Sequence, residues 1–330
     1  HPVVVGFSSQ VREPGDFLTD DLPATPVVVV RQKDRTLRAF ANICRHRGAK
    51  VAWGCGRATN GFTCPYHAWS YEIDGSLATI TDDYGFTGVE RERHYLIELP
   101  VAEKHGLVWV RPTPGDPVDV GAILGGLGED LDRFGIPTYE LLETRMIRRR
   151  MNWKLMSDTF WEAYHIKVLH RRTVGQLFPR NLGLFQAFGR SHRFAGIRRS
   201  IEALRNAPEE TWSLVPHSTI LMNFFPNTVF IMQSDHAEAF RVFPDPERPG
   251  EAQMAVSILV PPATAKDPQW TKTMDLVIGV LDEDFTVGET IQRNFETGLA
   301  DRVVYGRFEQ ALDHFHRSVR EALAEANDRY

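Results

Sequence analysis

Two short cysteine–histidine pairs constrain the fold of this chain more than any other feature. The first is Cys44-Arg45-His46 and the second is Cys64-Pro65-Tyr66-His67, with seventeen residues between them. The surrounding sequence alternates short apolar runs with turn residues, which is the pattern of strands joined by tight loops. Each pair is therefore predicted to place one thiol and one imidazole on a loop of a β-rich module.

Two cysteines and two histidines can hold either an iron–sulfur cluster or a single ion. In a Rieske [2Fe–2S] centre two cysteines bind one iron and two histidines bind the other. Zinc is the alternative, but zinc motifs usually place both cysteines first and two histidines later on a helix. Here the pairs are mixed and lie between strands, so the pattern favours the [2Fe–2S] cluster with Cys44, His46, Cys64 and His67 as ligands.

The first 111 residues predict an antiparallel all-β module. Tight hairpin turns are expected at Lys33-Asp34 and Asp74-Gly75, each between two strand-like runs. Proline and glycine then cluster between Arg111 and Pro117, which is typical of a domain boundary. We therefore predict one domain at residues 1–114 and a second at residues 115–330.

The second domain mixes helices with strands, which predicts an α+β fold. A strand at 143–151 is followed by a helix from Asn152 to His170, and the basic segment from there to Arg205 is expected to be loop with short helices. Strand-like runs then return as a meander between residues 218 and 262. Weakly helical residues at 118–134 precede these elements, and two amphipathic helices at 270–294 and 307–327 follow them.

The segment from Asn152 to His170 carries a second candidate metal site. On a helical period Asp158, Glu162 and His165 fall on one stripe, whereas His170 lies well round the helix. Both imidazoles can meet one ion only if the helix bulges or ends between them. Two imidazoles and one carboxylate suit ferrous iron that keeps positions open for dioxygen. Ordinary surface or core histidines are the alternative.

Composition and charge narrow the functional classes. A net charge of −5 argues against a nucleic-acid-binding protein, and no apolar run reaches membrane length, so a cytoplasmic location is expected. Cys55 is left over from the two pairs and is expected to be buried or half-buried without chemistry. Between Arg145 and Arg205 fourteen basic residues face three acidic ones. This strip could dock an acidic electron-transfer partner, attract a carboxylated substrate, or face an acidic neighbouring subunit.

These motifs together resemble the Rieske non-haem iron oxygenases over nearly the whole chain. The resemblance lies in CRHRG from Cys44, CPYHAW from Cys64, NWK and D-T-x-x-E-A-Y-H-x-x-x-x-H from Asn152, and E-D-x-x-x-x-E-x-x-Q from Glu283. It implies a Rieske domain followed by a helix-grip-like catalytic domain with mononuclear Fe(II). The iron ligands implied by the family are His165, His170 and Asp284.

Several carboxylates near these ligands in the sequence must be weighed beside the assignment of Asp284. Asp282 and Glu283 rival Asp284, which is preferred because the family pattern places the ligand five residues before Glu289. Glu162 stands where most members carry an aspartate that links the cluster of one subunit to the iron of the next. The glutamate resembles members that act on carnitine, choline and betaine. Its alternative is an ordinary helix carboxylate paired with a lysine or arginine, and Asp158, one turn earlier, is a second candidate catalytic carboxylate.

The resemblance also implies a reaction and partners. The protein would use dioxygen, with electrons from a separate reductase or ferredoxin, to hydroxylate a small organic substrate. No glycine-rich dinucleotide fingerprint is present, so the reducing equivalents must come from a partner. A homotrimer is expected, with or without a small β subunit. An aromatic substrate is favoured on family grounds, a quaternary ammonium or methylated amine is the alternative, and an electron carrier or sensor without a second iron is the competing class.

Residues of the substrate pocket are expected on two elements. Some flank the histidine segment and others lie on the returning strands, where aromatic residues are as readily plain core. The candidates are Phe160, Trp161, Ala163, Phe224, Phe225, Phe230 and Met232.

Overall fold

The computed structural model describes residues 1–179, 183–300 and 302–327. It forms two compact units. The N-terminal unit comprises His1–Val120 and Leu131–Tyr139, and the C-terminal unit comprises Gly121–Asp130 and the described residues from Glu140 onward. Both α1 (Val120–Leu124) and α2 (Leu127–Arg133) contain residues of each unit, and the single boundary predicted after residue 114 stays a prediction.

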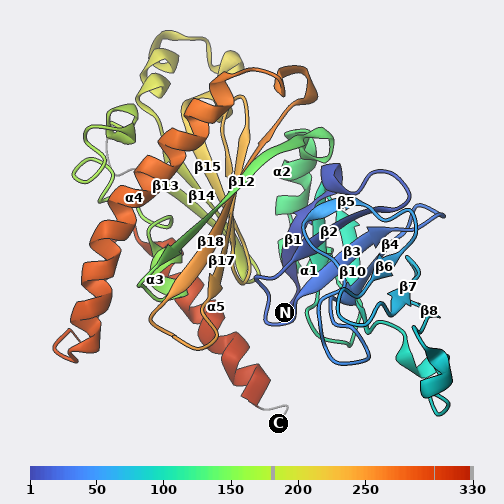
Figure 1. Ribbon diagram of the computed structural model, residues 1–330. Helices are drawn as coiled ribbons and strands as arrows, with labels where there is room; N and C mark the ends of the chain where they lie inside the picture. The colour runs from blue at the N-terminus through green and yellow to red at the C-terminus, as the bar shows by residue number, and fades with distance from the viewer. Residues whose placement is uncertain (180–182, 301, 328–330) are drawn as a thin grey trace. The chain divides into compact units, whose positions relative to one another are not determined.

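The N-terminal unit consists of three antiparallel sheets, which confirms the predicted all-β module (Figure 1). Strands at Asp16–Asp20, Cys55–Arg57, Glu98–Leu99 and Val101–Lys104 were not expected from the sequence, because charged residues or glycine interrupt their apolar pattern. In hydrogen-bonding order the sheets are β1 (Val3–Phe7), β11 (Leu107–Val110) and β10 (Val101–Lys104); β5 (Cys55–Arg57), β2 (Asp16–Asp20), β3 (Val27–Arg31), β4 (Leu37–Ala41) and β9 (Glu98–Leu99); and β6 (Phe62–Thr63), β7 (Ser70–Tyr71) and β8 (Leu77–Thr79).

Both predicted hairpins are present. Lys33-Asp34 joins β3 to β4, and Asp74-Gly75 joins β7 to β8. Gly75 has φ of 85°, and a β-carbon there would come within 2.5 Å of the Phe40 ring, so the turn requires glycine. The expectation for Cys55 was wrong: its side chain is exposed, because β5 lies at the edge of its sheet.

A seven-stranded antiparallel sheet forms the centre of the C-terminal unit, which confirms the α+β prediction and the predicted meander. The expectation of loop after His170 was wrong in part, because β13 and β14 pair there as a hairpin. Glycine and arginine break their apolar pattern, so neither strand stands out in the sequence. In order the sheet contains β12 (Glu140–Arg149), β18 (Ala252–Val260), β17 (Ala237–Pro244), β16 (Thr228–Met232), β15 (Ser218–Phe224), β14 (Ser191–Ile197) and β13 (Gly183–Phe188).

Two long helices lie against this sheet, as predicted. Figure 1 shows α4 (Gln269–Glu296) crossing the sheet. Apolar side chains of α4 and of α5 (Gln310–Asn327), such as Phe285 and Phe315, share one buried cluster with strand residues such as Val256. No helix among the described residues is long and apolar enough to cross a membrane.

The predicted helix from Asn152 to His170 was wrong beyond its first turns. Asn152 caps α3 (Trp153–Asp158) by accepting a hydrogen bond from the Lys154 amide at 3.0 Å. Past Asp158 the amides of Phe160 and Trp161 bond three residues back rather than four, and the Glu162 carboxylate accepts the amides of Tyr164 and His165. A side chain that captures nearby amides competes with helix formation. The three predicted residues therefore do not share a helical stripe.

A buried histidine pair lies between β14 and α5. His192 is fully buried and packs its ring 4.4 Å from Trp161 and 5.3 Å from His314, centroid to centroid. The Nε2 atoms of both histidines lack a hydrogen-bond partner among the described residues. Burial and the nearby His314 lower the pKa of His192 to about 3.

We expect this pair to make the C-terminal unit sensitive to acid. The folded-state pKa of His192 lies below its unfolded value, so its contribution is complete above pH 6.5 and declines as the pH falls toward 3. The loss from this residue is about 2 kcal/mol at pH 5. Urea unfolding of the wild-type protein and of H192Q at pH 7 and pH 5 tests this. The stability difference between them should shrink or reverse at pH 5, and an unchanged difference would contradict the assignment.

Candidate functional site

The two cysteine–histidine loops have the same backbone construction. The Cys44 amide donates to the Ala49 carbonyl at 2.7 Å, and the Cys64 amide donates to the Trp69 carbonyl at 2.8 Å. In each loop the fourth residue after the cysteine returns a hydrogen bond to the cysteine carbonyl. That residue has positive φ in both loops, 80° at Gly48 and 55° at Ala68. Two equivalent loops thus present equivalent ligands.

The four side chains of these loops fit an iron–sulfur cluster. Cys44 and Cys64 are buried free thiols, and the rings of His46 and His67 lie 4.5 Å apart. The Nδ1 atoms of both histidines are buried without a hydrogen-bond partner among the described residues. Such orphaned acceptors are costly unless a metal satisfies them. Burial, together with His67 and Arg47, lowers the pKa of His46 and favours the neutral imidazole that binds metal.

The Tyr71 side chain contacts the site formed by the two cysteine–histidine loops. Its hydroxyl lies 3.4 Å from the Cys44 Sγ and accepts the Arg45 amide at 2.9 Å. Burial and the Cys44 thiol raise the pKa of Tyr71, so the phenol keeps the proton that it can donate to sulfur. Hydrogen bonds to cluster sulfurs favour the reduced state.

We therefore expect Y71F to lower the reduction potential of the cluster. Loss of a hydrogen bond worth about 1 kcal/mol corresponds to about 40 mV for one electron. Redox titration followed by electron paramagnetic resonance measures the potential. A Y84F variant, whose exposed ring lies in a 3-10 turn, provides the control. An unchanged potential in Y71F would show that the phenol does not act on the cluster.

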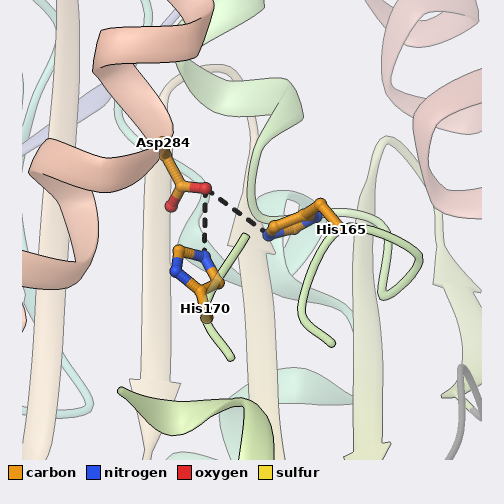
Figure 2. A group of neighbouring side chains, drawn as sticks. All are labelled: His165, His170 and Asp284. Atoms are coloured by element: carbon orange, nitrogen blue, oxygen red, sulfur yellow. Dashed lines mark ion pairs between the residues drawn. The ribbon is translucent and has the colours of Figure 1, made fainter. Parts of the chain in front are cut away.

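The second site brings together His165, His170 and Asp284. One carboxylate oxygen of Asp284 lies 3.1 Å from His170 Nε2 and 3.5 Å from His165 Nε2 (Figure 2). One ligand atom from each residue falls within 4.8 Å of the other two. The two histidines come from the turns after α3, and the aspartate comes from the buried face of α4. Two imidazoles and one carboxylate with open positions are the facial triad of non-haem Fe(II), so these residues fit that ion.

The two rivals of Asp284 point elsewhere. Asp282 pairs with Arg149, and Glu283 binds Nδ1 of His170 at 2.6 Å. Successive helical residues diverge by about 100°, so only one of three adjacent carboxylates can face the Nε2 atoms of both imidazoles. The structure therefore brings Asp284 to the position of a ligand and Glu283 to a supporting position that the sequence did not reveal.

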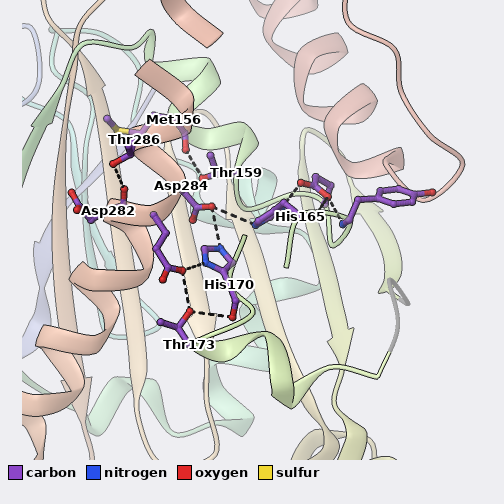
Figure 3. A network of polar contacts seen from close by, with 11 residues as sticks. Met156, Thr159, His165, His170, Thr173, Asp282, Asp284 and Thr286 are labelled. Atoms are coloured by element: carbon purple, nitrogen blue, oxygen red, sulfur yellow. Dashed lines mark hydrogen bonds and ion pairs between the residues drawn. The ribbon is translucent and has the colours of Figure 1, made fainter. Parts of the chain in front are cut away.

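A carboxylate stands behind each histidine. Glu162 accepts from Nδ1 of His165, and Glu283 accepts from Nδ1 of His170 and from the Thr173 hydroxyl at 3.0 Å (Figure 3). Burial opposes ionisation of Glu162, but its hydrogen bonds with the His165 ring and with the amides of Tyr164 and His165 hold its pKa below the usual range. Each carboxylate fixes the ring so that Nε2 faces Asp284, which is the usual support of metal-bound histidine.

Burial would also lower the pKa of His170, but Asp284 and Glu283 raise it. Metal binding requires the neutral ring and would displace that proton.

Asp158 is not part of the group formed by the candidate iron ligands and their two supporting glutamates. Its carboxylate lies 2.9 Å from Nε2 of His316 on α5, and burial raises its pKa despite that contact.

A cavity of about 360 Å³ opens beside the three candidate ligands and is lined mainly by apolar side chains. Among the predicted pocket residues Phe160 lines it, whereas Trp161, Ala163, Phe225 and Met232 do not. Strand residues alternate between faces, so Ile231 faces the cavity and its neighbour Met232 faces away. Phe224 and Phe230 stack on each other outside the cavity.

Other lining residues were not predicted. They lie just after the 3-10 turn at Val174–Leu177, on β14, on β17 and along α4, where the apolar pattern is equally that of ordinary core. They include Phe178, Phe194, Phe240, Leu276, Val280 and Leu281.

Comparisons with known proteins match both units. Residues 1–85 match the model described as Rieske [2Fe-2S] domain, and residues 133–325 match the one described as ring hydroxylating alpha subunit (catalytic domain). The carnitine monooxygenase oxygenase subunit of Acinetobacter baumannii is 33% identical over 170 residues, 51% of this chain and 46% of that protein. The chlorobenzene dioxygenase subunit alpha of Cupriavidus sp. is 30% identical over 168 residues, 49% of this chain and 37% of that protein.

The chain thus spans less than half the length of these curated relatives. Solved structures are similar over more of it. A quaternary ammonium Rieske monooxygenase has a TM-score of 0.77 at 24% identity, covering 89% of this chain and 79% of its own. Naphthalene 1,2-dioxygenase has a TM-score of 0.72 at 19% identity, covering 97% and 86%. At these identities the likeness establishes the fold.

Proposed function

Because the chain belongs to the family of ring-hydroxylating alpha subunits and carries a Rieske [2Fe–2S] domain, we propose that it is the terminal oxygenase of a multicomponent system. The observation that carries the proposal is the convergence of His165, His170 and Asp284 beside a largely apolar cavity. When bound, the cluster and the mononuclear Fe(II) would supply one-electron transfer and reductive activation of dioxygen.

The chain's own residues prepare the site for this chemistry. Glu162 and Glu283 hold the imidazoles in one tautomer and orientation. Phe160, Leu281 and other apolar side chains around the ligands exclude bulk water and hold the organic part of a substrate. The outcome is hydroxylation at the carbon that the cavity presents to the iron.

The main candidate substrate is an aromatic compound. The mostly apolar lining supports an apolar substrate body, and a dioxygenase alpha subunit is among the relatives. A quaternary ammonium or methylated amine is the second candidate. It is favoured by Glu162, one methylene longer than the aspartate usual in the family, and by the carnitine monooxygenase relative. A Rieske electron carrier or sensor without a second iron is the competing class, and the three converging ligands argue against it.

The proposal includes partners. A separate reductase or ferredoxin would deliver the electrons, and a homotrimer, with or without a small β subunit, would bring the cluster of one chain to Glu162 of the next. A cytoplasmic location is part of the proposal, because a reducing compartment keeps thiols such as exposed Cys55 free.

Metal analysis and oxygen uptake test the proposal together. The purified protein should contain three irons for each chain, and a generic reductase should support substrate-dependent oxygen uptake when aromatic acids and betaines are screened. The cis-dihydrodiol, monohydroxylated or demethylated product identifies the reaction. Two irons in the intact protein, with no substrate-dependent uptake, would favour the electron carrier.

A further inference from the structure

The cavity has a polar end that lies far from the iron ligands. Its lining follows α4 from Asp284 back to Thr273, eleven residues or about 16 Å of helix. One turn before Thr273, the Trp270 ring packs 5.4 Å from the ring of His236, which also lines the cavity. The group around His236 therefore faces the opposite end from Asp284.

Strand register gathers the polar residues at that end. Thr219 on β15 pairs with Gly196, two residues before Arg198, and the Gln233 amide donates to the His236 carbonyl at 3.0 Å. The next row of the sheet toward the iron ligands contains the apolar residues Phe194, Leu221 and Ile231, together with Glu238 of β17, which also lines the cavity. The cavity thus becomes more polar along the strands with distance from the iron ligands.

Arg198 is the cation of this polar end. Its Nε donates to the Thr219 hydroxyl at 3.0 Å, and its Nη2 donates to the Gln233 side-chain oxygen. Both partners are neutral, and Arg198 forms no ion pair with a carboxylate in the part of the chain that the structure describes. Two fixed hydrogen bonds orient the guanidinium toward the cavity while its charge stays available to a ligand.

This pairing separates Arg198 from four other arginines of the basic strip. Arg145, Arg149, Arg190 and Arg193 each pair with an acidic side chain of this chain. These four have protein counter-ions, and none of them lines the cavity.

The nearby acids are engaged by His236. Its Nδ1 lies 2.7 Å from Asp235 and its Nε2 lies 3.1 Å from Glu238, which also accepts from Gln233 at 3.2 Å. A neutral imidazole donates from only one nitrogen, so contact with two carboxylates favours the imidazolium. Burial opposes that charge, yet Glu238 and Asp235 raise the pKa of His236. Burial lowers the pKa of Arg198 although Asp235 and Glu238 act to raise it, so both acids lie within electrostatic reach of the guanidinium. Their hydrogen-bonding partner is His236, and the guanidinium keeps donors for a ligand.

Resting on the proposed oxygenase function, we propose that the substrate is an elongated, largely apolar carboxylic acid. Its carboxylate is bound by Arg198, and its far end lies beside His165, His170 and Asp284. A bidentate guanidinium–carboxylate pair fixes both position and orientation. The separation of the two ends then determines which carbon meets the iron, so chain length should govern reactivity.

Binding of a matched probe series tests the assignment without turnover. The probes are ω-phenylalkanoates with two to eight chain carbons, the corresponding amides and the corresponding ω-phenylalkyl-trimethylammonium ions, titrated calorimetrically into the oxidised iron-loaded protein. The wild-type protein should bind the best acid about 10- to 100-fold more tightly than its amide. R198Q should lose this preference, and R198K should keep part of it.

The adjacent residue supplies a matched control. Arg199 is exposed, does not line the cavity and contacts only the Gln176 carbonyl among the contacts described. R199Q therefore removes the same charge one residue away and should bind the probes as the wild-type protein does. Cluster absorption and thermal unfolding verify that R198Q is folded. If it is not, the assignment of Arg198 is tested by R198K and by the acid-over-amide preference of the wild-type protein.

Several results would overturn the assignment. These are the absence of any acid-over-amide preference in the wild-type protein, tighter binding of the trimethylammonium series, and an unchanged preference in R198Q. The underlying function is tested separately by oxygen uptake. Acid selectivity that depends on Arg198, without uptake for any probe, would refute the oxygenase and keep the binding site. Oxygen uptake with neutral or cationic compounds at equal rates in the wild-type protein and R198Q would keep the oxygenase function and refute the binding site.

Discussion

Replacing His165 by alanine is expected to remove one of three irons from each chain and to abolish substrate-dependent oxygen uptake. The imidazole supplies one of only three protein ligands, and the remaining pair, His170 and Asp284, cannot hold Fe(II) in the same geometry. The cluster ligands belong to the other compact unit, so the visible absorption of the cluster should be unchanged. Iron analysis, absorption spectroscopy and an oxygen electrode measure the three quantities.

The matched control for this variant is H217A. His217 also lies in the C-terminal unit, but its ring bonds to Ser200 at 3.0 Å and lies outside the candidate iron site. Three irons and normal uptake are expected there. If H165A kept all three irons, the assignment of the mononuclear site would be wrong. If H165A lost the iron but kept oxygen uptake, the site would not be the place of reaction.

The cluster residues and the histidine pair could be predicted because each motif is local in sequence. Cys44 with His46, and Cys64 with His67, are each confined to one loop, so spacing alone identifies the donors. Asp284 is different. It lies more than a hundred residues from His170, and helical periodicity does not separate it from Asp282 and Glu283. The family resemblance favoured Asp284, and the physical reason is the direction in which each side chain leaves the helix.

Side-chain contacts that sequence patterns do not report explain the wrong predictions of the helix and the pocket. The segment after Asp158 has helical spacing, but the Glu162 side chain captures backbone amides, which periodicity does not report. The strand residues named for the pocket, Phe224, Phe230 and Met232, lie on the correct strands at the wrong parity, because apolar residues occupy both faces of a fully buried sheet. Arg198 lies in a charge-rich strip, and its special position depends on Thr219 and Gln233, which are distant in sequence.

Exchange of Glu162 for glutamine is expected to slow electron delivery from the cluster to the iron by about 10- to 100-fold. Glutamine has the same shape, and its one oxygen can still accept from His165 Nδ1 although the amides of Tyr164 and His165 lose their acceptor, so both metals should stay bound when Fe(II) is in excess. What is lost is the carboxylate charge that our proposal places between a ligand histidine and the cluster of a neighbouring chain. Rapid mixing of the reduced protein with oxygen and substrate gives the rate of cluster oxidation, and iron analysis gives the metal content.

The matched control is E283Q, because Glu283 stands behind His170 as Glu162 stands behind His165. A purely supporting role predicts the same effect for both variants, namely weaker iron binding that added Fe(II) restores. A role in electron transfer predicts that iron-saturated E283Q oxidises its cluster at the normal rate while iron-saturated E162Q does not. Equal rates in the two saturated variants would show that Glu162 only supports its histidine, because our proposal places the cluster of a neighbouring chain beside Glu162 and not beside Glu283.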